Sequence, residues 1–157
     1  MSRRKAREIV LCLVFEKDYH NDISCEKLYD DLFENCDLTE VFDYFGDNII
    51  NAISVEAKTQ TLNRPDEEYI KTAFFGIFDN IEEIDNIISN SIIGWQYNRI
   101  SKVSMALLRI AVYEILYIED ITVPVAINEA VELSKRYDYS EAYTFVNGVL
   151  GAVVKNI

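Results

Sequence analysis

Apolar residues recur at every third or fourth position through most of the chain, and this spacing predicts amphipathic helices. No segment shows the strict apolar–polar alternation that is typical of a half-buried strand. The sequence therefore predicts an all-α protein. The predicted helices cover residues 2–19, 24–35, 39 to the break at 63–66, 66–78, 81–93, 101–118, 124–137 and 140–156.

Helix ends are indicated by capping and breaking residues. Ser24, Thr39 and Ser140 each stand where a side-chain oxygen can cap the following helix. Pro124 suits the first turn of its helix, where no backbone N–H donor is needed. The run Asn63-Arg64-Pro65-Asp66 is expected to break the chain between two helices.

Residues 101–118 are apolar on nearly every face, so this helix is expected to be central and buried. We therefore expect a compact bundle of about seven helices. The apolar positions of the central helix are Val103, Ala106, Leu107, Ile110, Val112, Ile115 and Leu116.

The composition agrees with a helical, intracellular protein. Half of the residues are hydrophobic, and only 5 Gly and 2 Pro are present, fewer than a β-sandwich or barrel normally needs. Cys12, Cys25 and Cys36 form no CxxC pair, which disfavours a disulfide framework and a structural zinc site. We expect reduced thiols in a cytoplasmic protein.

The start of the chain superficially resembles a signal peptide, because basic residues precede the apolar run at residues 9–15. Glu16, Lys17 and Asp18 follow at once, and no small-residue cleavage site is present. The run is also too short to span a membrane. We interpret it as the start of a mature cytosolic protein.

Charge is distributed unevenly along the chain. The formal net charge is −12, which by itself argues against a nucleic-acid partner. Residues 1–20, however, carry five Lys and Arg against three Asp and Glu, whereas residues 21–86 carry four against seventeen. A basic arm on an acidic body suits local contact with phosphate groups. The alternative is a basic start that only solubilises the terminus.

Residue types needed for catalysis are scarce. His20 is the only histidine, so a nucleophile–histidine pair would depend on one residue. Neither GxxxxGK[ST] nor GxGxxG occurs, and too few His and Cys are present for a multi-ligand metal site. We expect no enzyme activity, no cofactor and no metal. Acidic residues suit a solvated helix face better than acid–base chemistry: Asp30, Asp31, Glu34, Asp37, Glu82, Glu83 and Asp85.

Several polar residues lie inside apolar helices of the last third, where burial is costly without a partner. Arg109 and Glu114 could form an ion pair, and Asn128, Glu129 and Asn147 could tie helices together. Gly148 in mid-helix costs about 1 kcal/mol relative to alanine. It is expected to serve close helix approach or access of a ligand.

Four ordered sequence blocks are similar to one known family. They are RRKARE, LLRIAVYE, VAINEAVELSK and FVNGVL, and together they extend over essentially the whole chain. The chain resembles the NusB family of bacterial transcription antitermination factors. The resemblance implies a single domain of two packed helical halves, about residues 1–63 and 66–157.

The resemblance also implies the ligands. Family members bind boxA, a single-stranded RNA element, together with NusE, a small-subunit ribosomal protein. The pair joins an antitermination complex on RNA polymerase and supports transcription of ribosomal RNA. Some members self-associate through the RNA face, so a weak homodimer is a further expectation. The matching RNA-binding positions are Arg3, Arg4, Lys5, Arg7, Glu141, Phe145 and Asn147.

Phe145 is the candidate for base stacking, with burial in the core as its alternative. NusE contact is implied for Phe15, Tyr19 and Ser104. Ser104 stands where the family often has an acid, and Phe15 replaces a frequent tyrosine. Cys12 stands where glutamine is frequent, and the acidic middle segment is also unusual for the family.

A similar helical domain precedes the catalytic domain of some RNA cytosine methyltransferases, but this chain has no room for a cofactor-binding α/β domain. A helical protein adaptor without RNA binding is the remaining alternative, and the basic arm argues against it.

Overall fold

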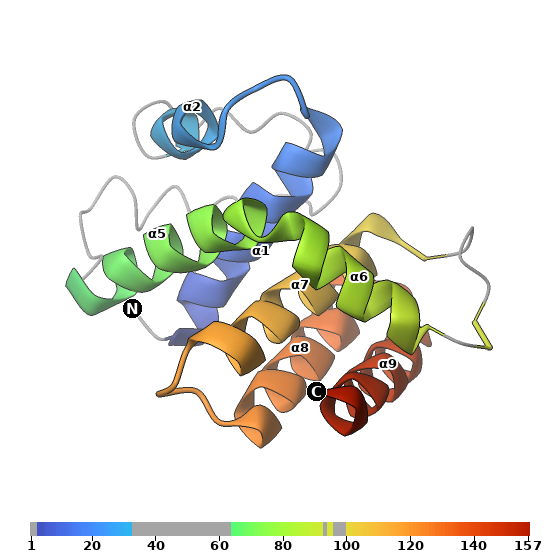
Figure 1. Cartoon of the computed structure of the whole chain (residues 1–157). Coiled ribbons are helices and arrows are strands. Elements are labelled where there is room, and N and C mark those ends of the chain that lie inside the picture. The colour runs from blue at the N-terminus through green and yellow to red at the C-terminus, as the bar shows by residue number, and fades with distance from the viewer. Residues whose placement is uncertain (1–2, 33–63, 93, 96–99) are drawn as a thin grey trace. The chain divides into compact units, whose positions relative to one another are not determined.

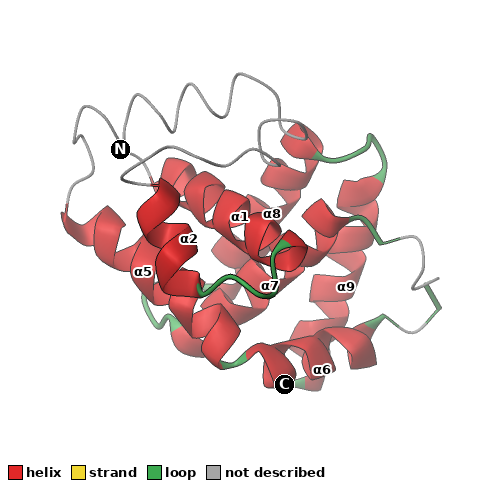
Figure 2. Ribbon diagram, turned by 90° about the horizontal axis from the view of Figure 1, so that it is seen from above, coloured by secondary structure: helices red, strands yellow, loops and turns green. Residues whose placement is uncertain are grey.

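The computed structural model describes residues 3–32, 64–92, 94–95 and 100–157. These residues form seven α-helices. Figure 2 shows helices and no strand in the described part of the chain, so the predicted all-α class is confirmed. The helix predicted to begin at Thr39 lies outside the described residues. The helices are α1 Arg3–Tyr19, α2 Cys25–Asp30, α5 Arg64–Asp79, α6 Ile81–Ser91, α7 Lys102–Tyr117, α8 Val123–Tyr137 and α9 Ala142–Asn156.

The chain divides into two compact units, residues 1–75 and 76–157. The boundary lies inside α5. This helix already begins at Arg64 and Pro65 occupies its first turn, so the expectation that these two residues lie in a break before the helix is wrong. Proline is well tolerated there, since the first N–H groups of a helix have no partner within it.

In the first unit, α1 is buried along most of its length and contacts α2. The predicted cap at Ser24 is confirmed, because its Oγ accepts a hydrogen bond from the Lys27 N–H at 3.2 Å. Lys17 Nζ donates to the carbonyl oxygens of Asn21 and Ile23 at 2.9 and 2.6 Å. These bonds close the turn between the two helices.

In the second unit, α7 packs against α6, α8 and α9, and α8 also packs against α9 (Figure 1). The prediction of a buried central helix is confirmed. Burial of its apolar side chains stabilises this unit by removing apolar surface from water. The buried apolar residues of α7 are Val103, Ala106, Leu107, Leu108, Ile110, Ala111, Val112 and Tyr113.

The start of α9 differs from the prediction. Pro124 lies in the first turn of α8 as expected, but Ser140 does not cap α9. The Ala142 N–H donates to the Tyr139 carbonyl at 3.1 Å, so Ser140 lies within a turn. The helix begins two residues later than predicted, and Glu141 precedes it without a side-chain cap.

A glycine within α5 allows close packing against α7. A Cβ atom on Gly76 would lie 2.6 Å from Tyr113 Cε2, and closer still to Cζ and the phenol oxygen. Tyr113 is itself buried, and burial, together with the charge of Asp79, raises the pKa of its phenol. The ring is therefore neutral and held against the bare backbone of Gly76.

Two thiols lie among the described residues, and neither forms a disulfide. Cys12 is buried, and burial followed by the charges of Glu8 and Glu16 raises the pKa of its thiol well above the usual value. A protonated, buried thiol is a poor nucleophile. None of the helices in the described part of the chain is long and apolar enough to cross a membrane.

Candidate nucleic-acid interface

The basic arm at the start of α1 is attached to α5 within the first unit. Arg3 Nε lies 3.6 Å from Asp66 Oδ1, and the Arg3 guanidinium carbon lies 4.4 Å from the centre of the Tyr69 ring. The Arg7 guanidinium carbon lies 5.9 Å from the same ring. Tyr69 thus contacts two cations through its electron-rich face.

These contacts divide the arm into two kinds of residue. Arg7 is only 4% exposed, so little of its side chain is accessible to a ligand. The Arg3 side chain is 40% exposed, Arg4 is exposed and Lys5 is half-buried. A phosphate can therefore reach Arg3, Arg4 and Lys5 more readily than Arg7. Neither Asp66 nor Tyr69 was identified from the sequence as a support of Arg3, since an acid in the first turn and an aromatic residue in the next turn are both ordinary in a helix.

The second group of candidate RNA-binding residues lies around α9, in the other unit. Glu141 and Asn147 are exposed, whereas Phe145 is only 6% exposed. The Trp95 ring meets the Phe145 ring edge-on, with centroids 5.0 Å apart and an interplanar angle of 76°. The structure agrees with the buried alternative for Phe145, whose ring supports the exposed indole of Trp95.

Of the two candidate partner residues on α1, both aromatic, one is buried and the other is exposed. Phe15 is buried, and its ring lies 5.1 Å from the ring of Tyr19. Tyr19 is 48% exposed. Phe15 can therefore hold the Tyr19 ring in place, while Tyr19 offers the surface that a partner can touch.

Ser104, the third candidate partner residue, is buried in a network at the start of α7. The hydroxyls of Ser101 and Ser104 both donate to Asp138 Oδ2 at 2.6 Å. Ser101 Oγ also accepts the Ser104 N–H at 2.9 Å as the cap of α7. The Asp138 carboxylate thus lies at the positive end of the α7 dipole, where a negative charge is stabilising.

Replacing Asp138 with alanine is expected to lower the free energy of unfolding by about 2 kcal/mol, because two hydrogen bonds to a charged acceptor are lost. Urea unfolding measures the change. Asp138→Asn is the matched control, since it keeps an oxygen acceptor and loses only the charge. It should cost less than the alanine variant. Equal stability of Asp138→Ala and the wild type would contradict this role.

Among the polar residues of the last third of the chain, Arg109 has a partner that the sequence did not predict. Arg109 Nε and Nη2 donate to the two oxygens of Asp85 at 2.9 and 3.0 Å, which shows that Asp85 is a bidentate partner. Asn128 and Asn147 are exposed and form no hydrogen bond with the described residues, so neither ties helices together there. Asp85 was interpreted from sequence as part of a solvated acidic face.

Within the described residues, no group of three or more His, Cys, Asp and Glu side chains could hold a metal ion. The conspicuous surface features are instead a basic helix start in one unit and an exposed, uncharged helix face with an adjacent indole in the other. These two surface features define the chain as an all-helical protein with surfaces suited to binding a ligand or partner.

The family model described as the NusB family matches residues 4–155. The chain belongs to the NusB family. A curated relative named transcription antitermination protein NusB, from Acetivibrio thermocellus, is 39% identical over 155 residues, which is 99% of this chain and 90% of the relative.

Solved structures share the fold. The structure of T. maritima NusB is 30% identical, with a TM-score of 0.74 over 99% of this chain and 92% of that chain. A structure described as antitermination factors NusB and NusE in complex with dsRNA is 24% identical, with a TM-score of 0.71 over 99% and 97% of the two chains. At that identity the likeness shows the fold alone.

Proposed function

We propose that this chain is a transcription antitermination factor. It binds boxA-type single-stranded RNA together with NusE and joins the RNA polymerase antitermination complex in the cytoplasm, supporting transcription of ribosomal RNA. Family membership supports the general role, because the curated relative is named for antitermination. A NusB protein of the same fold has been crystallised with NusE and dsRNA.

The observation that carries the proposal is the basic arm. Arg3, Arg4 and Lys5 present cationic side chains at the start of α1, and Asp66 and Tyr69 hold the first of them in place. Because the net charge of the chain is −12, the rest of the protein repels polyanions in general. Binding through a local arm on such a body favours a defined RNA site over indiscriminate attachment.

The residues proposed to contact NusE are Tyr19 in the first unit and, separately, Ser104 at the start of α7 in the second unit. Ser104 lacks the carboxylate that the family often has at this position. Asp138 Oδ2, only 2.6 Å from the Ser104 hydroxyl, brings a negative charge to the same place. A charge-dependent contact with NusE therefore remains available through Asp138.

The salt dependence of RNA binding tests the proposed role of the arm. Three to four phosphate contacts are expected to give a slope of about −2 to −3 in a plot of log affinity against log salt, at roughly −0.7 per contact on single strands. Fluorescence anisotropy of a labelled boxA-type RNA measures it between low and moderate salt. A slope near zero would mean that the arm makes no phosphate contact.

A further inference from the structure

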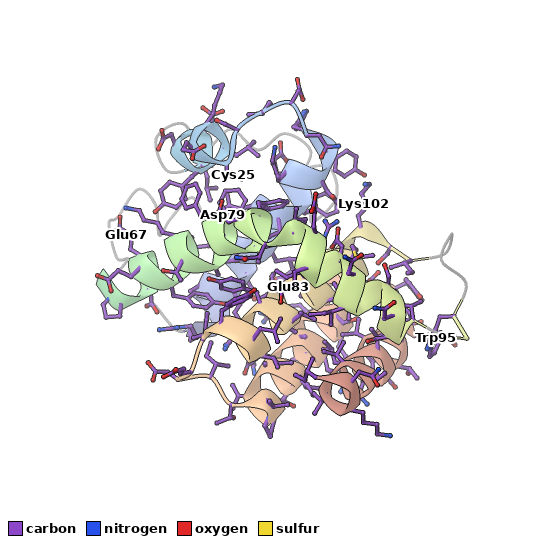
Figure 3. The ribbon with its side chains drawn as sticks, in the orientation of Figure 1. Cys25, Glu67, Asp79, Glu83, Trp95 and Lys102 are labelled. Atoms are coloured by element: carbon purple, nitrogen blue, oxygen red, sulfur yellow. The ribbon has the colours of Figure 1, made fainter. Side chains whose placement is uncertain are left out.

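The single tryptophan of the chain projects beside the last helix of the second unit. After α6 the chain reverses at Gly94, whose φ of +93° lies in the left-handed region. The Trp95 N–H donates to the Ile92 carbonyl at 2.9 Å, which fixes the backbone of the turn. Figure 3 shows Trp95 just beyond the end of α6.

The Trp95 side chain is held on one side and open on the other. The edge-on contact with Phe145, at 5.0 Å, braces the indole from α9. Nevertheless 45% of Trp95 is exposed, whereas Phe145 is almost fully covered. A large aromatic side chain that is positioned by a buried neighbour and still open to solvent is suited to stack on a ligand.

Gly148 keeps the helix surface next to this indole bare. A Cβ atom at Gly148 would lie 3.6 Å from Trp95 Cζ2, an ordinary contact distance. Among the described residues, no helix therefore packs so closely against Gly148 that a glycine is required there. This removes one of the two roles expected for this glycine. Glycine in a helix interior still costs about 1 kcal/mol relative to alanine. Access of a ligand is the remaining explanation.

The exposed face of α9 beside the indole is polar but uncharged. Tyr143, Thr144, Asn147 and Gly148 all lie on it and are exposed. An apolar protein partner would find few apolar side chains here, whereas a nucleobase combines a stacking face with polar edges. Lys135 Nζ lies 5.0 Å from the centre of the Tyr143 ring, so a cation for a neighbouring phosphate is close to this face.

We propose that Trp95 stacks on an unpaired base of the bound RNA, and that the bare backbone at Gly148 and the Asn147 carboxamide receive the edge of that base. The inference rests on the proposed RNA-binding function and names the residues that contact a base. It assigns the stacking role to Trp95, while Phe145 positions the indole from below.

Intrinsic fluorescence tests the stacking directly, because all tryptophan emission comes from Trp95. Titration with a boxA-type RNA is expected to quench this emission, with the same midpoint as the anisotropy of a labelled copy of the RNA. A set of RNAs, each with one abasic nucleotide at a different position, locates the stacked base. Each of these RNAs should quench the Trp95 emission normally, except the one that lacks the base that stacks on Trp95.

Two variants separate binding from folding. Trp95→Leu is expected to weaken RNA binding roughly 5- to 100-fold, the range for loss of one stacked base. Gly148→Ala should raise the midpoint of thermal unfolding by about 2–4 °C and yet weaken RNA binding. Tyr117→Leu is the control, since Tyr117 is an exposed aromatic at the end of α7, 42% exposed, and should leave RNA affinity unchanged.

The outcomes distinguish this inference from the function on which it rests. Wild-type protein that binds RNA by anisotropy, with unchanged tryptophan emission and unchanged affinity in Trp95→Leu, would overturn the stacking role alone. Quenching by NusE without RNA would assign the indole to a protein contact and also overturn it. Absence of any RNA binding by the wild type would overturn both proposals.

Discussion

Replacing Arg4 and Lys5 together with alanine is expected to weaken binding of boxA-type RNA about 25-fold at 0.1 M salt. Each phosphate contact on a single strand releases about 0.7 counterion, which corresponds to roughly fivefold in affinity at this salt concentration. Loss of two contacts should also make the log–log slope less negative by about 1.4. Anisotropy titrations at several salt concentrations measure both quantities.

The matched control is Lys27→Ala with Lys71→Ala, because both lysines are exposed in the same unit and the net charge changes equally. It should leave the slope unchanged, since neither residue belongs to the arm. Equal losses in both double variants would mean that only net charge matters. If the chain is instead a helical adaptor without RNA binding, the anisotropy of the labelled RNA should not change with the wild type or with either double variant. NusE binding should survive in both variants.

Replacing Gly76 with alanine is expected to lower the free energy of unfolding by about 2 kcal/mol and the unfolding midpoint by about 4–8 °C. In an exposed helix interior the same change would stabilise the protein by about 1 kcal/mol. Here the new Cβ atom would lie 2.6 Å from Tyr113 Cε2 and nearer still to Cζ, so the buried ring must leave its site. Thermal unfolding followed by circular dichroism measures the shift.

Changes at Tyr113 show whether the ring is the cause. In a Tyr113→Leu background the shorter side chain no longer reaches Gly76, so Gly76→Ala should cost little or even stabilise. In a Tyr113→Phe background the ring carbons remain in place, and the cost should persist. An unchanged cost in the leucine background would contradict steric conflict with Tyr113.

The helices of the second unit could be predicted from sequence because their apolar spacing is regular and their ends carry local signals. Residues 101–118 lack a polar face, and the structure buries α7 among three other helices. The cap at Ser24 was predictable for the same reason, since its hydrogen bond joins residues three positions apart. Signals of this kind depend only on neighbours in the chain.

Local signals failed where two of them compete. Ser140 has the side chain of a good cap, but the turn closed by the Ala142 N–H and the Tyr139 carbonyl includes it. Pro65 was expected to end up in a break, although proline is equally compatible with the first turn that it occupies. Sequence alone did not decide between these alternatives.

The supports of the candidate site were not predictable, because they join residues far apart in the chain. Asp138 accepts from Ser101 and Ser104, which lie 37 and 34 positions away. Asp66 and Tyr69 similarly contact Arg3, although they lie near the opposite end of the first unit in the sequence. The sequence identified the cations and hydroxyls, and the fold supplied the partners that position them.

We propose above all that this chain recognises boxA-type RNA with the help of NusE. The most direct measurement is the anisotropy of a labelled boxA-type RNA and of a scrambled control, each titrated with the protein in the presence and absence of NusE. We expect tighter binding of the boxA-type RNA than of the scrambled control, and a further gain in affinity when NusE is present. Equal, weak binding of both RNAs that NusE leaves unchanged would contradict it.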